Sequence, residues 1–284
     1  MKKITIITDT DSSLPADVAN QFNIRQVPIT IHFGDDSYTT GVDIDDRKVF
    51  EIVDRVGKIP TTAAPPPGAF AKAYEDAFTA GADALVCICV SSKISATHAA
   101  AVTACEEFPG KPIRVIDSLN LSMGQGFQVL AAAEAAQAGA SLDEIEARAT
   151  DVAGRLVTFA VLPTLKYLAL SGRVGKLAAG MADTLSIKPI LTVREGKLEL
   201  LERIRTQKVA NQRLLELVQA AVGEKTVERY AVIHVNNLEG AREMQAKIAE
   251  MMPLPEACIY AEFTPGLSVH AGAGVVGVVV QTGR

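Results

Sequence analysis

Two carboxylates stand directly after the first apolar run of the chain, in the order Asp9-Thr10-Asp11. An Asp-x-Asp pair in this position suits a phosphotransferase, because one carboxylate can attack a phosphoryl group while Mg²⁺ balances its charge. The same residues also suit a polar turn, since Asp and Thr side chains cap free N–H groups. We favour the turn, because Asp-x-Asp is short and recurs by chance. A Mg-dependent phosphotransferase that uses Asp9 and Asp11 is kept as the alternative.

Hydroxyl groups cluster in two further segments. Thr61 and Thr62 lie in a proline-rich loop, PTTAAPPPG, whose stiffness would hold their hydroxyls ready as hydrogen-bond donors. Ser91 and Ser92 follow the apolar run ALVCICV and precede a predicted helix at 96–107. Ligands bind at the carboxyl ends of parallel strands, and a helix N-terminus there favours an anion. Each pair also fits an ordinary turn or helix cap, so we treat these residues as candidate binding groups.

His270 is the histidine whose surroundings favour function, because it follows FTPGLSV in a glycine-rich loop. Its imidazole can hydrogen-bond a carboxylate or carry positive charge toward one. The nearby GAGVVG matches a dinucleotide fingerprint, yet a valine run rather than a helix follows it, so we reject that interpretation. The segment GLSVH lacks the second glycine and the later histidine of a hydrolase nucleophile elbow. We therefore predict no catalytic residues.

Composition and charge argue against several classes of protein. The 284 residues carry a net charge of −5, which argues against a nucleic-acid partner. Apolar runs are too short for a membrane span, and the N-terminus reaches Asp9 too soon for a signal peptide, so we expect a cytoplasmic protein. No histidine lies at metal-ligand spacing from the cysteines. We predict buried reduced thiols, no metal and no cofactor.

Basic residues gather in one stretch of the second half. Between residues 166 and 208 nine Lys or Arg accompany four acids, a local charge of +5 in a chain of −5. Such a patch is a solvated face or a docking surface for an acidic or phosphate-bearing partner. The bases are Lys166, Arg173, Lys176, Lys188, Arg194, Lys197, Arg203, Arg205 and Lys208, and the acids are Asp183, Glu195, Glu199 and Glu202.

Strands and helices in alternation must position these groups. Apolar, β-branched runs at 3–8, 84–90 and 113–116 are each followed by a helical pattern, which predicts a parallel sheet covered on both faces. The pattern changes near residue 155. Strand-like runs at 187–193 and 198–204 then flank the turn REGK, and two helical patterns and a valine-rich strand follow.

We predict a two-domain protein of the α/β class from this order of elements. The N-terminal α/β/α domain covers residues 1–155 and the C-terminal α+β domain covers residues 156–284, with a mixed or antiparallel sheet.

Taken together, these segments resemble the DegV family along nearly the whole chain. ITDTDSSLP resembles the opening motif of the family, PTTAAP its Thr-Ser-Gln-Pro loop, and SSKISAT its Ser-Ser-x-Leu-Ser-Gly-Thr turn. TLKYL, SGR and IKPIL are the most characteristic stretches, and RIRT and His270 complete the series. Ala63 and Ala64 replace the usual Ser-Gln, and Ala96 replaces Gly.

The resemblance implies a protein that binds one long-chain fatty acid in a buried tunnel between the domains. Members of the family include the fatty-acid-binding subunits of bacterial fatty acid kinase. A kinase partner similar to dihydroxyacetone kinase would phosphorylate the carboxylate to an acyl phosphate for phospholipid synthesis. Arg173 and Arg205 would face that kinase or a membrane surface. The residues implied at the carboxylate are Thr61, Thr62, Ser91, Ser92 and His270.

Overall fold

The N-terminal half is built on a parallel sheet. The computed structural model describes residues 2–173 and 187–284. Its first sheet has the strand order β2-β1-β6-β7, and every pairing is parallel. β6 is buried along its whole length, as an apolar run covered on both faces should be. The strands are β1 (Ile4–Asp9), β2 (Arg25–Val27), β6 (Ala84–Cys89) and β7 (Ile113–Asp117).

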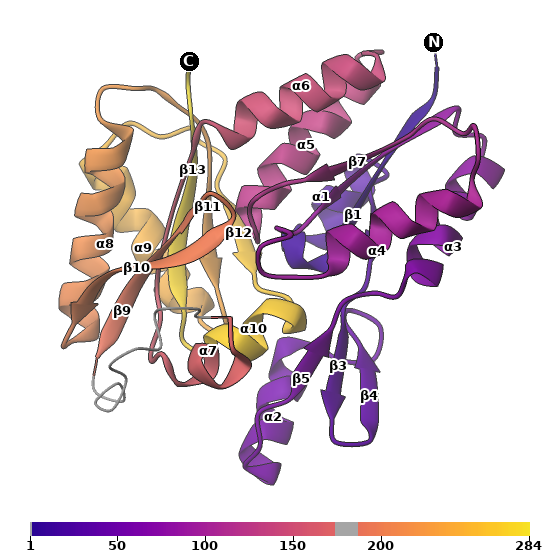
Figure 1. Ribbon diagram of the computed structural model, residues 1–284. Coiled ribbons are helices and arrows are strands. Elements are labelled where there is room, and N and C mark those ends of the chain that lie inside the picture. Colours follow the sequence, from indigo (N-terminus) through magenta and orange to yellow (C-terminus); the bar gives the residue numbers. More distant parts are fainter. Residues whose placement is uncertain (1, 174–186) are drawn as a thin grey trace.

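Helices cover both faces of this sheet (Figure 1). On one face α3 (Pro67–Thr79) packs Phe70 and Tyr74 against the apolar side chains of β6, and α4 (Thr97–Ala104) adds Ala101 and Ala104 to the same core. The other face carries α5 (Met123–Gln137) and α6 (Leu142–Ala153). Short helical turns complete this half, namely η1 (Thr10–Ser12), α1 (Ala16–Gln21) and η2 (Cys105–Glu107).

A small three-stranded sheet, which the sequence reading did not anticipate, projects from this half. Its order is β4-β3-β5, and both pairings are antiparallel. The strands are β3 (Thr30–Phe33), β4 (Asp36–Thr39) and β5 (Thr61–Ala63), and α2 (Asp46–Val56) lies beside them. The loop predicted for Thr61 and Thr62 is therefore wrong, because both residues belong to β5. Successive side chains of a strand point to opposite faces, so the two hydroxyls point away from each other.

The C-terminal half contains a six-stranded mixed sheet with the order β10-β9-β8-β13-β11-β12. β11 and β12 run parallel, and the other pairings are antiparallel. This arrangement confirms the predicted α/β class with its parallel and mixed sheets, whereas the division at residue 155 stays a prediction. The strands are β8 (Leu156–Val161), β9 (Lys188–Arg194), β10 (Lys197–Ile204), β11 (Val227–His234), β12 (Ile259–Glu262) and β13 (Val276–Thr282).

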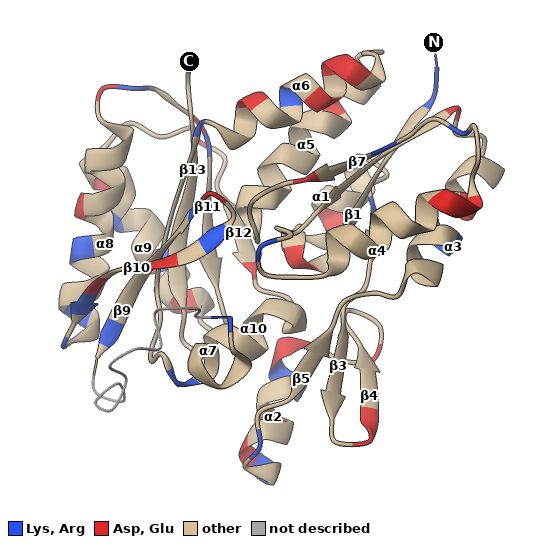
Figure 2. Cartoon of the chain, viewed as in Figure 1, with Lys and Arg blue, Asp and Glu red and all other residues tan. Residues whose placement is uncertain are grey.

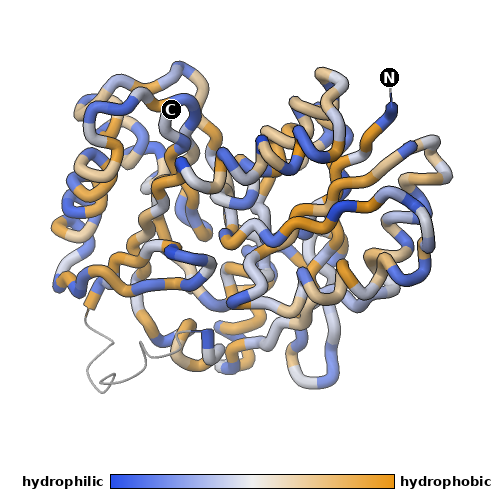
Figure 3. The backbone as a smooth tube through the Cα atoms, turned by 45° about the horizontal axis from the view of Figure 1, so that its top comes forward, coloured by the Kyte–Doolittle hydropathy of each residue, from blue (hydrophilic) through white to orange (hydrophobic). Residues whose placement is uncertain are grey.

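The two faces of the six-stranded sheet have different partners. α8 (Gln207–Val222) and α9 (Leu238–Met251) cover the outer face with their own apolar core. The inner face turns toward the N-terminal half, and its apolar side chains join a core that continues into the parallel sheet. Figure 3 shows hydrophobic stretches of the chain in both halves. Two short helices, α7 (Lys166–Ser171) and α10 (Pro265–Ala271), lie where the halves meet α2.

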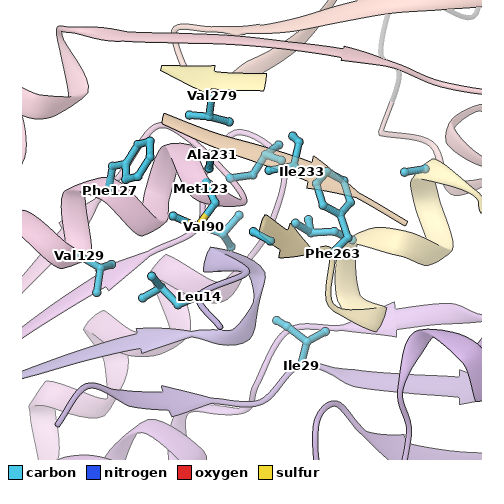
Figure 4. Packing of buried hydrophobic residues seen from close by; sticks show 14 of the residues in the cluster. Leu14, Ile29, Val90, Met123, Phe127, Val129, Ala231, Ile233, Phe263 and Val279 are labelled. Carbon is cyan, nitrogen blue, oxygen red and sulfur yellow. The ribbon is translucent and has the colours of Figure 1, made fainter. Parts of the chain in front are cut away.

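α5 fills part of the space between the two sheets. Its sequence, MGQGFQVLAAAEAAQ, is small or apolar almost all round, which is typical of a helix buried on every side. Its first eleven residues are all buried. Figure 4 shows Met123 and Phe127 of this helix facing Ala231 and Val279 of the six-stranded sheet. The halves are thus joined by a continuous apolar core.

A second connection between the halves is polar. The turn between β9 and β10 reaches the end of β6, where the Ser91 hydroxyl donates to the Gly196 carbonyl at 2.7 Å. Gly196 has φ +79°, and a Cβ there would lie 2.6 Å from Ser91 Oγ and 3.0 Å from Leu119. Glycine is needed at this turn for both reasons.

Candidate ligand-binding site

A cavity of about 570 Å³ lies between the two halves. Its N-terminal wall is formed at the carboxyl ends of β1 and β6. The strand order reverses between these two neighbours, because β2 lies beyond β1 and β7 lies beyond β6. Ligands of α/β proteins bind outside the carboxyl ends of the strands at such a switch point. Figure 4 shows Ile29 and Val90 from this half opposite Ile233 and Phe263 from the other. All four line the cavity.

Most of the remaining wall is aliphatic. β8, β9 and β10 turn a row of side chains into the cavity because alternate residues of each strand share one face. The volume lies inside the range of about 300–1,000 Å³ that is usual for small-molecule sites. These strand residues include Ala160, Leu191, Val193 and Leu198.

Three polar side chains of the wall meet at Thr62. Its Oγ1 lies 3.0 Å from His270 Nε2, and it accepts a hydrogen bond from Arg173 Nη2 at 3.3 Å. Nη1 of Arg173 donates to the Ser171 carbonyl at 2.7 Å, which fixes the side chain. All three side chains line the cavity. A hydroxyl, an imidazole and a guanidinium therefore form one cluster on an otherwise largely apolar wall.

His270 is uncharged in this arrangement. Burial and the neighbouring Arg173 lower the pKa of His270 to about 3. The residue lies in the last turn of α10 rather than in the loop that the sequence predicted, because Pro265 starts a helix that the glycines end. Its Nδ1 has no hydrogen-bond partner among the described residues. The imidazole thus offers hydrogen bonds, and Arg173 supplies the positive charge that the sequence reading allowed to His270.

Of the two predicted serines, only Ser92 lines the cavity. It is exposed, and its N–H donates to Asp117 Oδ1 at 3.1 Å. Ser91 is fully buried, and its hydroxyl donates a hydrogen bond to the Gly196 carbonyl. Thr61 is exposed and does not line the cavity. The structure therefore brings Thr62, Ser92 and His270 to one cavity and places the hydroxyls of Thr61 and Ser91 outside it.

The two carboxylates of the opening motif differ in their surroundings. Asp9 is fully buried, and protein donors surround its oxygens: Oδ1 accepts from Asp11 N at 3.0 Å, and Oδ2 accepts from Val90 N at 2.8 Å and Gln125 Nε2 at 3.1 Å. Burial raises the pKa of Asp9 to about 6. A carboxylate held in this way ties β1 to β6 and is not placed to attack a phosphoryl group, so the geometry does not support the phosphotransferase alternative. Asp11 lines the cavity.

The described part of the chain offers no cluster of three or more His, Cys, Asp or Glu side chains suited to a metal ion. Cys87 and Cys89 share one face of β6, as the sequence predicted, with their sulfur atoms 3.7 Å apart. Across residues 2–173 and 187–284 no helix has the length and apolar character needed to cross a bilayer.

The predicted basic patch is partly neutralised. Arg194 pairs with Glu199 at 3.1 Å, and Lys188 donates to the Pro163 carbonyl. Arg205 is exposed between β10 and α8, and Figure 2 shows further basic segments on β9, β10 and α8. Lys176 and Asp183 lie outside the described residues.

Comparison with known proteins identifies the family. The family model described as DegV, a family of uncharacterised proteins, matches residues 3–283. The chain belongs to the DegV family. A DegV domain-containing protein of Mycobacterium tuberculosis is 37% identical over 282 residues, covering 99% of this chain and 98% of the relative. One from Streptomyces coelicolor is 33% identical over 281 residues and covers 99% of both chains.

Solved DegV structures share the whole fold. A DegV family protein from Thermus thermophilus, whose structure is described as fatty acid binding, has a TM-score of 0.92 at 28% identity and covers 99% of both chains. DegV from Bacillus subtilis, described as a fatty acid binding protein, has a TM-score of 0.88 at 27% identity and covers 100% of both chains.

The departures of this chain from the DegV motifs all lie on the cavity wall. Ala63, Ala64 and Ala96, the departures named from the resemblance, line it, so their methyl groups belong to the wall. Sequence reasoning missed that Arg173 and Asp11 also line the cavity, since it assigned Arg173 to a partner surface and Asp11 to a turn. The stretch SGR was noticed as characteristic, but only the tertiary contact with Thr62 shows where its arginine points.

Proposed function

We propose that this DegV protein binds one long-chain fatty acid in the cavity between its halves. The observation that carries the proposal is the cluster of Thr62, Arg173 and His270 on a cavity wall that is otherwise mostly aliphatic. Such a cavity fits an amphiphile with one compact polar end. The two related structures described as fatty acid binding, at 28% and 27% identity, support the same ligand class.

The charge of the cluster favours an acid over an alcohol or an ester. Arg173 carries a fixed positive charge in a half-buried position, and His270 beside it is neutral. A carboxylate would balance the guanidinium and accept hydrogen bonds from it and from the Thr62 hydroxyl. A buried charge without a partner is costly, so a neutral head group would leave Arg173 less well satisfied.

The size of the cavity suits a long chain. A water molecule takes roughly 30 Å³ of liquid volume, and at a similar volume for each non-hydrogen atom the cavity of about 570 Å³ holds a ligand of about twenty such atoms. Burial contributes about 0.8 kcal/mol for each methylene, so the tail supplies most of the affinity. The polar cluster supplies orientation.

We further propose that the bound carboxylate is presented to a partner kinase similar to dihydroxyacetone kinase, which converts it to an acyl phosphate. Two features support this role. The polar cluster lies where α10, α7 and β5 meet, and the exposed Arg205 and its basic neighbours offer a surface for an acidic partner. Transient contact with a membrane surface would allow the fatty acid to exchange. The chain itself then acts as a carrier and has no turnover of its own.

Lipid extraction tests the central proposal. The protein purified from a bacterial host is extracted with organic solvent, and the extract is examined by mass spectrometry. We expect a fatty acid in an amount equal to that of the protein, and we expect the stripped protein to take up added palmitate or oleate. A protein that carries no fatty acid and takes up neither would contradict the proposal.

A further inference from the structure

Asp11 is an acidic side chain of the cavity wall, and the proposed function leaves it without a role. It lies in η1, directly after β1, and only 6% of it is exposed. Ile29 and Gly266 line the cavity beside it. A Cβ at position 266 would lie 2.2 Å from Asp11 Oδ1, so glycine is needed for the backbone of α10 to rest against this carboxyl group.

The carboxyl group of Asp11 lacks the partners that its neighbour has. Its Oδ1 is buried and has no hydrogen-bond partner among the described residues, whereas the oxygens of Asp9 accept three hydrogen bonds from protein donors. A buried polar atom without a partner is uncommon in a folded protein and calls for a specific reason. Asp11 also lines the cavity, so its carboxyl group lies at the wall that a ligand would contact.

The electrostatic surroundings favour the protonated form of Asp11. Burial and the negative charge of Asp9 raise the pKa of Asp11 well above its usual value, and Arg173 opposes that rise. His270 of α10 is the other titratable group of the cluster and is neutral. α5 also packs on η1, but its one charged residue, Glu134, is paired with Arg229 at 2.5 Å.

We propose that Asp11 is a specificity-determining residue, a protonated carboxyl group that donates a hydrogen bond to the carboxylate of the bound fatty acid. This inference rests on the proposed function and deepens it. In the cluster around Thr62, one negative charge on the ligand would then face one positive charge on Arg173. In this proposal Asp11 donates a hydrogen bond to the ligand head group. The opening motif had suggested a polar turn or metal-dependent chemistry for this residue.

The chemistry of a neutral carboxyl group would make the site selective for a head group with a single negative charge. A protonated carboxyl group has one O–H donor, and an O–H that donates to a carboxylate forms a short, charge-assisted hydrogen bond. An ionised Asp11 would repel the ligand instead. The proton on Asp11 therefore permits a singly charged head group, and a second negative charge in the same place would exceed the charge of Arg173.

Two substitutions at Asp11 separate the roles of charge and of hydrogen bonding. Binding of dodecanoate to the full-length, lipid-stripped protein is measured at about pH 7, where the ligand is ionised. Asp11→Asn keeps the shape and a neutral donor, so its Kd should stay within about threefold of the wild-type value. Asp11→Leu keeps the bulk and loses the donor, so its Kd should rise at least about tenfold.

Two results would overturn the proposal. If Asp11→Asn bound dodecanoate about tenfold more tightly than the wild type, Asp11 would be ionised and repulsive. If a folded Asp11→Leu bound as the wild type does, Asp11 would not touch the head group. Should Asp11→Leu fail to fold, the isosteric Asp11→Asn still decides between a neutral and an ionised residue.

The pH dependence gives an independent measurement. Above the pKa of Asp11 the wild type must take up a proton to bind, so the ratio of its Kd to that of Asp11→Asn should rise with pH, by up to about tenfold per unit. A ratio that falls with pH would overturn the proposal. Asp46→Asn is the matched control, because Asp46 is a buried carboxyl that contacts α10 but does not line the cavity; it should keep the wild-type pH profile. Wild-type protein that binds dodecanoate in all these assays leaves the proposed function standing whatever Asp11 does.

Discussion

Replacing Thr62 by valine should weaken the hold on the head group and leave the hold on the tail unchanged. Valine keeps the branched shape that suits β5 and removes Oγ1. In the structure that atom lies 3.0 Å from His270 Nε2 and accepts from Arg173 Nη2 at 3.3 Å. The substitution therefore removes the hydroxyl at the centre of the polar cluster without opening a cavity.

The expected magnitude follows from the chemistry of the lost contact. A hydrogen bond to a charged group is worth about 1.5–3 kcal/mol. Since every 1.4 kcal/mol is a factor of ten, the Kd for a fatty acid should rise about ten- to 150-fold. Each methylene of the tail should still contribute about 0.8 kcal/mol, because the aliphatic wall is unchanged.

A series of ligands separates the two contributions. The Kd is measured for saturated acids from decanoate to palmitate by displacement of a fluorescent fatty acid. A plot of binding free energy against chain length should give parallel lines for wild type and Thr62→Val, displaced by the head-group term. Thr61→Val is the matched control, since Thr61 is the neighbouring residue of β5, exposed and away from the cavity. Its line should coincide with that of the wild type.

Three results would refute this reasoning. A Thr62→Val line that coincides with the wild-type line would show that the hydroxyl makes no contact with the head group. A changed slope would show that Thr62 contacts the tail. An equal displacement for Thr61→Val would show that the effect comes from β5 as a whole.

Two further predictions concern charge. Burial raises the pKa of Asp46 to about 8, above its unfolded value of about 3.9, so the folded state holds the extra proton between these values and loses stability as pH rises. The unfolding free energy of the wild type should therefore fall relative to that of Asp46→Asn by up to about 1.4 kcal/mol per unit from about pH 5 to 8, measured by denaturant titration; parallel pH profiles would contradict the burial argument. Arg205→Glu should lower the rate of acyl phosphate formation by the partner kinase on the order of tenfold, measured by trapping with hydroxylamine, without changing the Kd for fatty acid. Arg55→Glu, an exposed charge on α2, is its control, and equal rates for the two variants would rule out docking at Arg205.

The architecture could be predicted because it depends on local patterns. The continuous apolar run of β6 required cover on both faces, and the valine-rich β13 could only be a strand of a sheet. The family motifs likewise stand in contiguous stretches, so Thr62, Ser92 and His270 could be named before their contacts were known. The small sheet of β3, β4 and β5 escaped prediction, because strands of three or four residues carry too little periodicity.

The sequence by itself determined which residue types were available to a ligand, and the tertiary structure decided which of them share a site. Thr61 and Thr62 are the same residue type, and only the pairing of β5 with β3 turns one hydroxyl outward and the other toward His270. Arg173 contacts Thr62 although it lies more than a hundred residues away along the chain. The protonation of Asp11 and His270 was likewise undetermined, because a pKa depends on burial and on charges that meet only when the two halves pack together.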